Sequence, residues 1–149
     1  MRIDWLSHLT ARTGPFATVA MDVSHDDEGA GAAIDLRWRG HEERLRRHGV
    51  PDDVVDAVHD VAVSPTRRGG EVGRVVVASL DDGVLLDQLL PSAPSEESCT
   101  VGPVPDLVAL VRAFAGSASY VLALVDAAGA DVQVVSARGD ELEAETVVG

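Results

Sequence analysis

The stretch Phe16–Val23, which reads Phe-Ala-Thr-Val-Ala-Met-Asp-Val, decides the fold of this chain of 149 residues. It is apolar at nearly every position, and such a run is typical of a strand that is covered on both faces. Further strands are predicted at Arg74–Leu80 and Val84–Leu90, joined by a tight Asp81-Asp82-Gly83 turn. We expect these three strands to share one mixed β-sheet in which Phe16–Val23 is a central strand.

Two amphipathic helices are expected to cover one face of that sheet. Within Ala32–His48, apolar side chains and His41 recur on one stripe, and within Asp52–Val63 valines and aspartates take opposite faces. Gly49 is placed to end the first helix and Pro51 to begin the second. Other elements are predicted at Asp4–Arg12 (helix), Leu107–Phe114 (helix) and Cys99–Val104 (a short extended piece).

The last third of the chain has a different pattern. Three strands joined by short turns indicate an antiparallel meander, at Ser119–Asp126, Asp131–Ser136 and Glu141–Val148. The predicted fold class is therefore α+β. Because three strands are near the lower limit of independent stability, the meander should pack on the rest of the chain, pair with a second copy or be disordered. We favour a homodimer through the edge strand Glu141–Val148.

Composition bounds the class of protein. Hydrophobic residues make up 46% and charged residues 25%, which excludes wholesale disorder and a collagen-like chain. The single cysteine, Cys99, has no partner within the chain, which fits a reducing compartment. Neither a signal peptide nor a membrane-spanning run is recognisable, so we expect a cytoplasmic protein with no membrane partner.

The charge is lopsided, with 25 acidic residues against 12 basic ones, all arginine, and a net charge of −13. Such a chain repels nucleic-acid phosphates unless its arginines gather on one surface, which argues against DNA binding. The candidate RNA-binding residues are Arg37, Arg39, Arg44, Arg46 and Arg47 in one helix, and Arg67 and Arg68 in a loop. A solvated helix whose arginines pair with Glu42 and Glu43 at i, i+4 is the favoured alternative to an RNA-facing one.

No complete catalytic or metal site is recognisable in the sequence. His25 stands beside Asp26 and Asp27, with Asp22 nearby, but consecutive residues in one turn favour a helix cap and a solvated turn over a site. His41 and His48 are too far apart for the His-x-x-x-His spacing of a zinc helix, so a flank or core role is favoured. We expect no enzyme activity, no metal and no cofactor.

A family resemblance begins at the first strand. It rests on Gly14-Pro15-Phe16-Ala17-Thr18-Val19 followed by Asp22-Val23-Ser24-His25-Asp26. Two later stretches agree with it: Gly73-Arg74 before an apolar strand, and Ser119-Tyr120-Val121 before Val125-Asp126 and Ala128-Gly129-Ala130-Asp131-Val132. In order and spacing, these segments resemble the bacterial relatives of the archaeo-eukaryotic peptide chain release factor, an actinobacterial family related to the ribosome hibernation factor Balon.

The resemblance implies a release-factor-like N-terminal domain at 1–115 and the first strands of a ribonuclease-H-like central domain at 116–149. In relatives the N-terminal domain enters the aminoacyl site of the ribosome, so the implied partner is the rRNA of the decoding region. An elongation factor is implied as a partner of family domains outside this sequence. The Gly-Gly-Gln loop of release factors has no counterpart here, since Gly69-Gly70-Glu71 is only a near match in a flexible loop.

Three hypotheses follow. The first is a ribosome-binding module of a translation or stress-response factor, without catalysis of its own. The second is a fragment of a peptidyl-tRNA hydrolase-like enzyme, and the third is an acidic protein–protein adaptor with no RNA contact. The resemblance favours the first.

Overall fold

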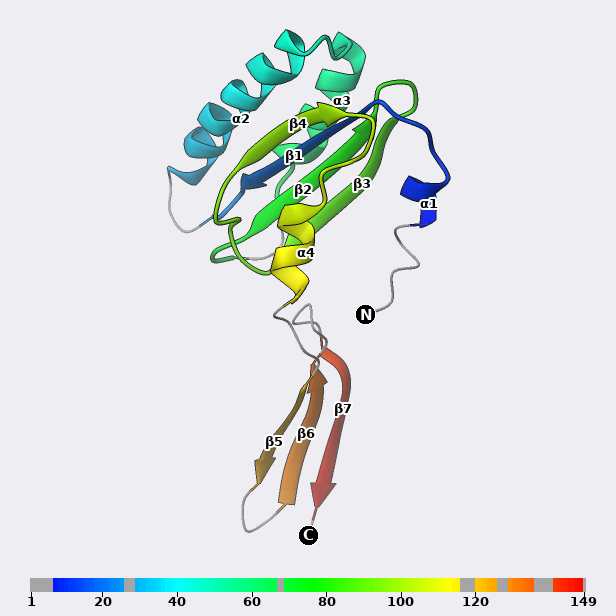
Figure 1. Ribbon diagram of the computed structural model, residues 1–149. Coiled ribbons are helices and arrows are strands. Elements are labelled where there is room, and N and C mark those ends of the chain that lie inside the picture. The colour runs from blue at the N-terminus through cyan, green and yellow to red at the C-terminus, as the bar shows by residue number, and fades with distance from the viewer. Residues whose placement is uncertain are drawn as a thin grey trace. The chain divides into compact units, whose positions relative to one another are not determined.

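The computed structural model describes residues 7–25, 29–66, 69–115, 120–125, 129–135 and 141–148 (Figure 1). The chain divides into two compact units, Met1–Leu110 and Val111–Gly149. The predicted domain boundary, between residues 115 and 116, lies a few residues after this division.

The first unit is built on a four-stranded sheet in the order β3-β2-β1-β4. The strands are β1 (Phe16–Asp22), β2 (Gly73–Ser79), β3 (Gly83–Leu90) and β4 (Ser98–Gly102). Strand β1 pairs with β2 on one side and with β4 on the other. The α+β fold class is therefore confirmed, and so is the central position of the apolar strand.

All pairings in this sheet are antiparallel, which differs from the mixed sheet that was expected. The reason lies in the connection between β1 and β2, which contains two helices, α2 (Ala30–Arg47) and α3 (Asp52–Ala62). A pair of helices joined by a short turn returns the chain to the end of the sheet that it left. The register shows this return, because Asp22 at the end of β1 pairs with Gly73 at the start of β2.

Helices α2 and α3 cover one face of the sheet, as predicted (Figure 1). The core on this side combines alternate residues of β1 with the apolar stripes of the two helices: Ala17, Val19, Met21, Ile34, Trp38, Leu45, Val54, Val55 and Val58. Helix α2 begins at Ala30, with Gly29 as its N-cap and no side-chain hydrogen bond. The Ser24 hydroxyl bonds to Asp22 and Val72 instead, and the cap candidates Asp26 and Asp27 lie outside the described residues.

The opposite face of β1 is also buried. Phe16, Thr18 and Ala20 alternate with the residues of the helix-side core, and each is at most 3% exposed. The backbone N–H of Asp106 donates to Thr18 Oγ1 at 3.2 Å, which places the segment before α4 (Val108–Ala115) on this side. Leu110 of α4 and Leu9 of α1 (Ser7–Thr10) are buried as well. Coverage of both faces explains why the strand is apolar throughout.

Arg74 of β2 is a buried charged residue, 4% exposed. Its Nη1 donates to the carbonyl oxygens of Val61 at 2.6 Å and Ser64 at 2.8 Å, and to the Ser64 hydroxyl at 2.8 Å. The last carbonyl groups of a helix have no hydrogen-bond partner within it, and a cation there also interacts favourably with the negative end of the helix dipole. Arg74 therefore fastens the C-terminal end of α3 to the sheet.

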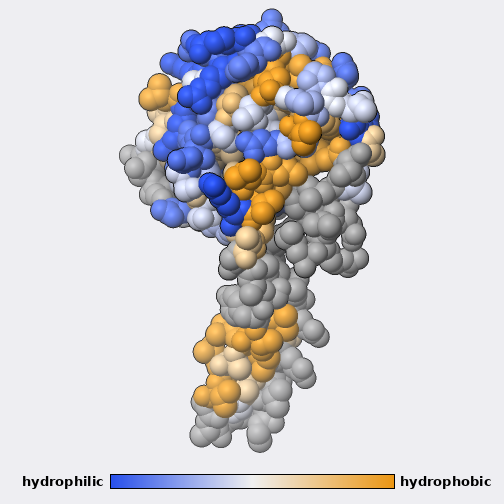
Figure 2. Space-filling view, in the orientation of Figure 1, coloured by the Kyte–Doolittle hydropathy of each residue, from blue (hydrophilic) through white to orange (hydrophobic). Residues whose placement is uncertain are grey.

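The second unit contains the antiparallel meander that was predicted. Its strands are β5 (Tyr120–Val125), β6 (Gly129–Val135) and β7 (Glu141–Val148), in the order β5-β6-β7. The side chains of Val121–Val125 are exposed on both faces of β5, and the described part of this unit is largely hydrophobic in Figure 2. Within the described residues of this unit, no second layer covers the sheet.

Candidate nucleic-acid interface

Two of the candidate arginines on α2 are neutralised along the helix itself. Arg46 contacts the carboxylates of Glu42 and Asp52, and Arg47 Nη2 lies 2.8 Å from Glu43 Oε1. The Glu42 and Glu43 pairs have i, i+4 spacing, as the solvated-helix interpretation predicted. For Arg46 and Arg47 the solvated interpretation is therefore supported, and these exposed pairs add little stability.

Two other arginines of α2 are exposed and free of such pairs. Arg39 and Arg44 have no ion pair within the described parts of the chain. Arg44 lies on the flank of α2 toward β4, where its charge lowers the pKa of the Cys99 thiol against the larger effect of burial. Arg39 lies on the other flank, with Arg46. These two guanidinium groups are the cations of α2 most available to a phosphate.

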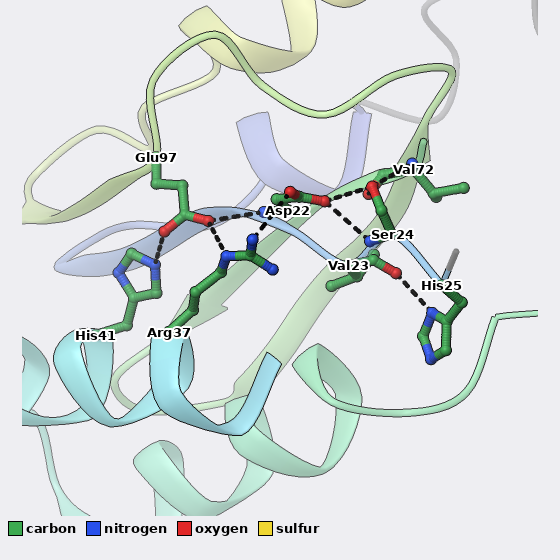
Figure 3. Close-up of polar contacts among 8 residues, drawn as sticks. All are labelled: Asp22, Val23, Ser24, His25, Arg37, His41, Val72 and Glu97. Atoms are coloured by element: carbon green, nitrogen blue, oxygen red, sulfur yellow. Dashed lines mark hydrogen bonds and ion pairs between the residues drawn. The ribbon is translucent and has the colours of Figure 1, made fainter. Parts of the chain in front are cut away.

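Arg37 joins a chain of polar contacts at the end of β1 (Figure 3). Its Nη2 lies 3.3 Å from Asp22 Oδ2, and its Nε lies 3.4 Å from Glu97 Oε1. Glu97 Oε1 also accepts from the backbone N–H of Asp22 at 3.1 Å. Arg37 is half-buried and doubly paired, so it positions the β3–β4 connection and is not a free cation.

His41 is buried beneath this chain of contacts, at 4% exposure. Its Nε2 lies 3.3 Å from Glu97 Oε2, yet neither ring nitrogen has a well-formed hydrogen bond. Burial lowers the pKa of His41, and the charge of Glu97 opposes this shift only in part. His41 therefore lies in the core, whereas His48 is exposed at the end of α2. The sequence spacing favoured a flank or core role for these two residues over a zinc site.

The Asp22, Ser24 and His25 side chains do not form a catalytic triad. Ser24 Oγ donates directly to Asp22 Oδ1, whereas in a triad the histidine stands between the hydroxyl and the carboxylate. His25 Nδ1 instead bonds to the backbone oxygen of Val23 at 2.7 Å. Burial raises the pKa of Asp22, but the hydrogen bonds from Ser24 and the charge of Arg37 outweigh it, so the net shift is downward. Asp22 is therefore a fixed carboxylate and not a proton carrier.

Some of the residues singled out in the sequence lie outside the described residues. Arg67, Arg68, Asp26 and Asp27 belong to that group. Among the described residues, no cluster of three or more histidine, cysteine, aspartate or glutamate side chains could hold a metal ion. Burial raises the pKa of Cys99 to about 11, which leaves its thiol protonated and unreactive at neutral pH.

Sequence reasoning missed Glu97 as a member of this cluster. It precedes a short strand in a Ser- and Pro-rich connection, and 75 positions separate it from the Asp22 backbone that it accepts from. The pairing of β4 with β1 brings it there. The residues next to Glu97 in the sequence do not indicate such a contact.

The described helices include none that is long and apolar enough to cross a membrane.

Comparison with known proteins gives two relatives. No protein-family model matches the chain. Over 134 residues it is 29% identical to the uncharacterized proteins Rv2629 and MT2704 of Mycobacterium tuberculosis, strains H37Rv and CDC 1551. The matched region is 90% of this chain but 36% of each relative, so the chain spans about a third of their length.

Proposed function

We propose that this chain is a ribosome-directed module of a release-factor-like or hibernation-factor-like translation factor, acting in the cytoplasm. It binds rRNA at the aminoacyl site through α2 and performs no catalysis of its own. The observation that carries the RNA contact is the pair of exposed guanidinium groups, Arg39 and Arg44, which no carboxylate neutralises within the described residues. The resemblance of the Gly14–Val19 and Asp22–Asp26 strings to the release-factor relatives supports the choice of the ribosome.

The charge distribution supports a local contact and not a broad basic face. Of the five α2 candidates, Arg37, Arg46 and Arg47 already contact carboxylates. If only Arg39 and Arg44 contact phosphates, the logarithm of the binding constant falls with the logarithm of salt concentration with a slope of about −1.4 to −1.8. A much steeper slope would require the paired arginines to exchange their partners for phosphate.

The absence of catalysis is supported by the geometry of the polar residues. Ser24 Oγ also accepts from the Val72 N–H at 3.0 Å, and the only base that it contacts among the described residues is Asp22, a carboxylate whose lowered pKa makes it a weak base. Peptidyl-tRNA hydrolysis is therefore not expected from this chain. The meander β5–β7 is proposed as the first strands of a ribonuclease-H-like central domain, which its strand order supports.

Co-sedimentation with 70S ribosomes at two salt concentrations tests the proposal. The Arg39→Glu/Arg44→Glu variant should lose binding, because both changed side chains are exposed and unpaired. The control is Arg12→Glu/Arg112→Glu, which changes the net charge equally at two exposed arginines outside α2; Arg12, unlike Arg39 and Arg44, contacts Asp82 at 2.8 Å. Equal loss in both variants would reduce the effect to overall charge and contradict an α2 interface.

Failure of the wild-type chain to sediment at low salt would refute the proposal. It would favour the acidic adaptor, for which α3 offers the exposed carboxylates of Asp52, Asp53, Asp56 and Asp60. Hydrolysis of a model peptidyl-tRNA by the wild-type chain, lost on substitution of Ser24 or His25, would favour the enzyme hypothesis.

A further inference from the structure

Within the described residues Asp22 to His25, the turn after β1 satisfies its polar side chains internally, with one exception (Figure 3). Asp22 Oδ1 accepts from the Ser24 N–H at 2.9 Å and from the Ser24 hydroxyl, while Asp22 Oδ2 faces Arg37 at 3.3 Å. Ser24 Oγ accepts from the Val72 N–H at 3.0 Å. The atom left over is the second ring nitrogen of His25, Nε2, which has no hydrogen-bond partner among the described residues.

The hydrogen bond of His25 fixes which nitrogen carries the proton. A carbonyl oxygen can only accept, so Nδ1, at 2.7 Å from Val23 O, must donate. In the neutral form of the ring the single N–H is then on Nδ1, and Nε2 carries a lone pair. His25 is exposed, and its backbone forms a β-bridge with Gly70, which holds the base of the side chain. The turn thus presents a hydrogen-bond acceptor to solvent in a fixed orientation.

An acceptor of this kind selects its partner by chemistry. Phosphate oxygens and carboxylates are acceptors themselves, so a neutral Nε2 gains no hydrogen bond from them. The partner must donate, and in RNA the 2′-hydroxyl is a donor that every nucleotide carries in the shallow minor groove.

We infer that His25 Nε2 accepts a hydrogen bond from a ribose 2′-hydroxyl of the bound rRNA. This inference rests on the proposed function and adds a second contact to it. His25 precedes the N-terminal end of α2, whereas Arg44 lies in its last turn, with most of an 18-residue helix between them. The two contacts are therefore separate, and the effects of their variants should add.

The proton position is tested on the free chain by ¹⁵N NMR of the imidazole nitrogens near pH 8. We expect His25 to be the Nδ1–H tautomer, with Nε2 showing the shift of an unprotonated nitrogen. A protonated Nε2 in the neutral ring would overturn the inference whatever the chain does with ribosomes.

The RNA contact is tested by 70S co-sedimentation of His25→Asn and His25→Ala. Asparagine keeps a donor at the δ position for Val23 O and removes the acceptor at the ε position, whereas alanine removes both. We expect both variants to bind about two- to tenfold more weakly, the range for losing one hydrogen bond. If only His25→Ala binds more weakly, the histidine merely shapes the turn and the inference fails.

The failures of the two proposals are distinguishable. Wild-type binding by His25→Asn, together with loss of binding in Arg39→Glu/Arg44→Glu, would overturn the His25 contact and leave the proposed function intact. If the wild-type chain does not bind ribosomes, both proposals fail.

Discussion

Replacing Arg74 by methionine should be among the most damaging single changes in the first unit. Nη1 of Arg74 contacts four oxygen atoms at the end of α3, those of Val61, Ala62 and Ser64, and its two hydrogens can satisfy two of them well. Hydrogen bonds to a charged group contribute about 1.5–3 kcal/mol each. Asp87, whose carboxylate lies 3.0 Å from Arg74 Nε, would also lose its ion-pair partner. A loss of about 3–5 kcal/mol in the free energy of unfolding follows.

Urea unfolding, followed by the fluorescence of the buried Trp38, measures this loss. With a slope of about 1–3 kcal/mol per molar urea, the midpoint should fall by roughly 2 M. Arg112→Met is the control, because Arg112 is exposed on α4 and its removal should change stability by less than about 0.5 kcal/mol. A loss below about 1 kcal/mol for Arg74→Met would refute the reasoning, since it would mean that water replaces the guanidinium at the end of α3.

Three further outcomes are expected. Burial lowers the pKa of His41 below 6.5, so the unfolded chain binds the proton at a higher pH than the folded chain does. The free energy of unfolding should therefore fall as the pH drops below about 6.5. The urea midpoints at about pH 5.5 and about pH 7.5 should differ less in His41→Gln than in the wild-type chain. Gly73→Ala should lower the free energy of unfolding by about 1–3 kcal/mol, because the added Cβ would lie 2.7 Å from Ser92 O. Gly40 is in a helix and has open space around it, so Gly40→Ala should raise the free energy of unfolding by up to about 1 kcal/mol in the same assay. Light scattering at two concentrations should show a homodimer through an edge of the meander, and a concentration-independent monomer would contradict it.

The elements of this fold could be predicted because each has a local signature. The apolar run at Phe16–Met21 identifies a strand covered on both faces, and the Asp81-Asp82-Gly83 turn predicts the hairpin, where Gly83 has a φ of 79°. The helical stripes of α2 and α3 contain the residues that are buried against the sheet. Periodicity reports which side chains are buried, and that information lies within a few residues of chain.

The relations between elements could not be predicted in the same way. The direction of β2 relative to β1 depends on how many helices connect the two strands. The sequence predicts that Arg74 lies in a strand, but it does not indicate that the guanidinium contacts the end of α3. The sequence does not reveal which arginines are free, because Arg37 is neutralised by Glu97, a residue that only the β1–β4 pairing brings near. Which arginines are available to RNA therefore depends on carboxylates that are distant in the sequence.

An acidic chain can still present RNA with a defined cationic surface if its carboxylates lie elsewhere. On α3, Asp53, Asp56 and Asp60 share one exposed stripe, and Asp52 lies beside Arg46. RNA that approached the α3 side of α2, where Arg46 lies, would meet these carboxylates. The flank toward β4 is different, because the positive charge of Arg44 lies there and lowers the pKa of both His41 and Cys99. Arg39 shares the α3 flank with Arg46, so phosphate is repelled less at Arg44, and of the two arginines Arg44 is expected to contribute more to RNA binding.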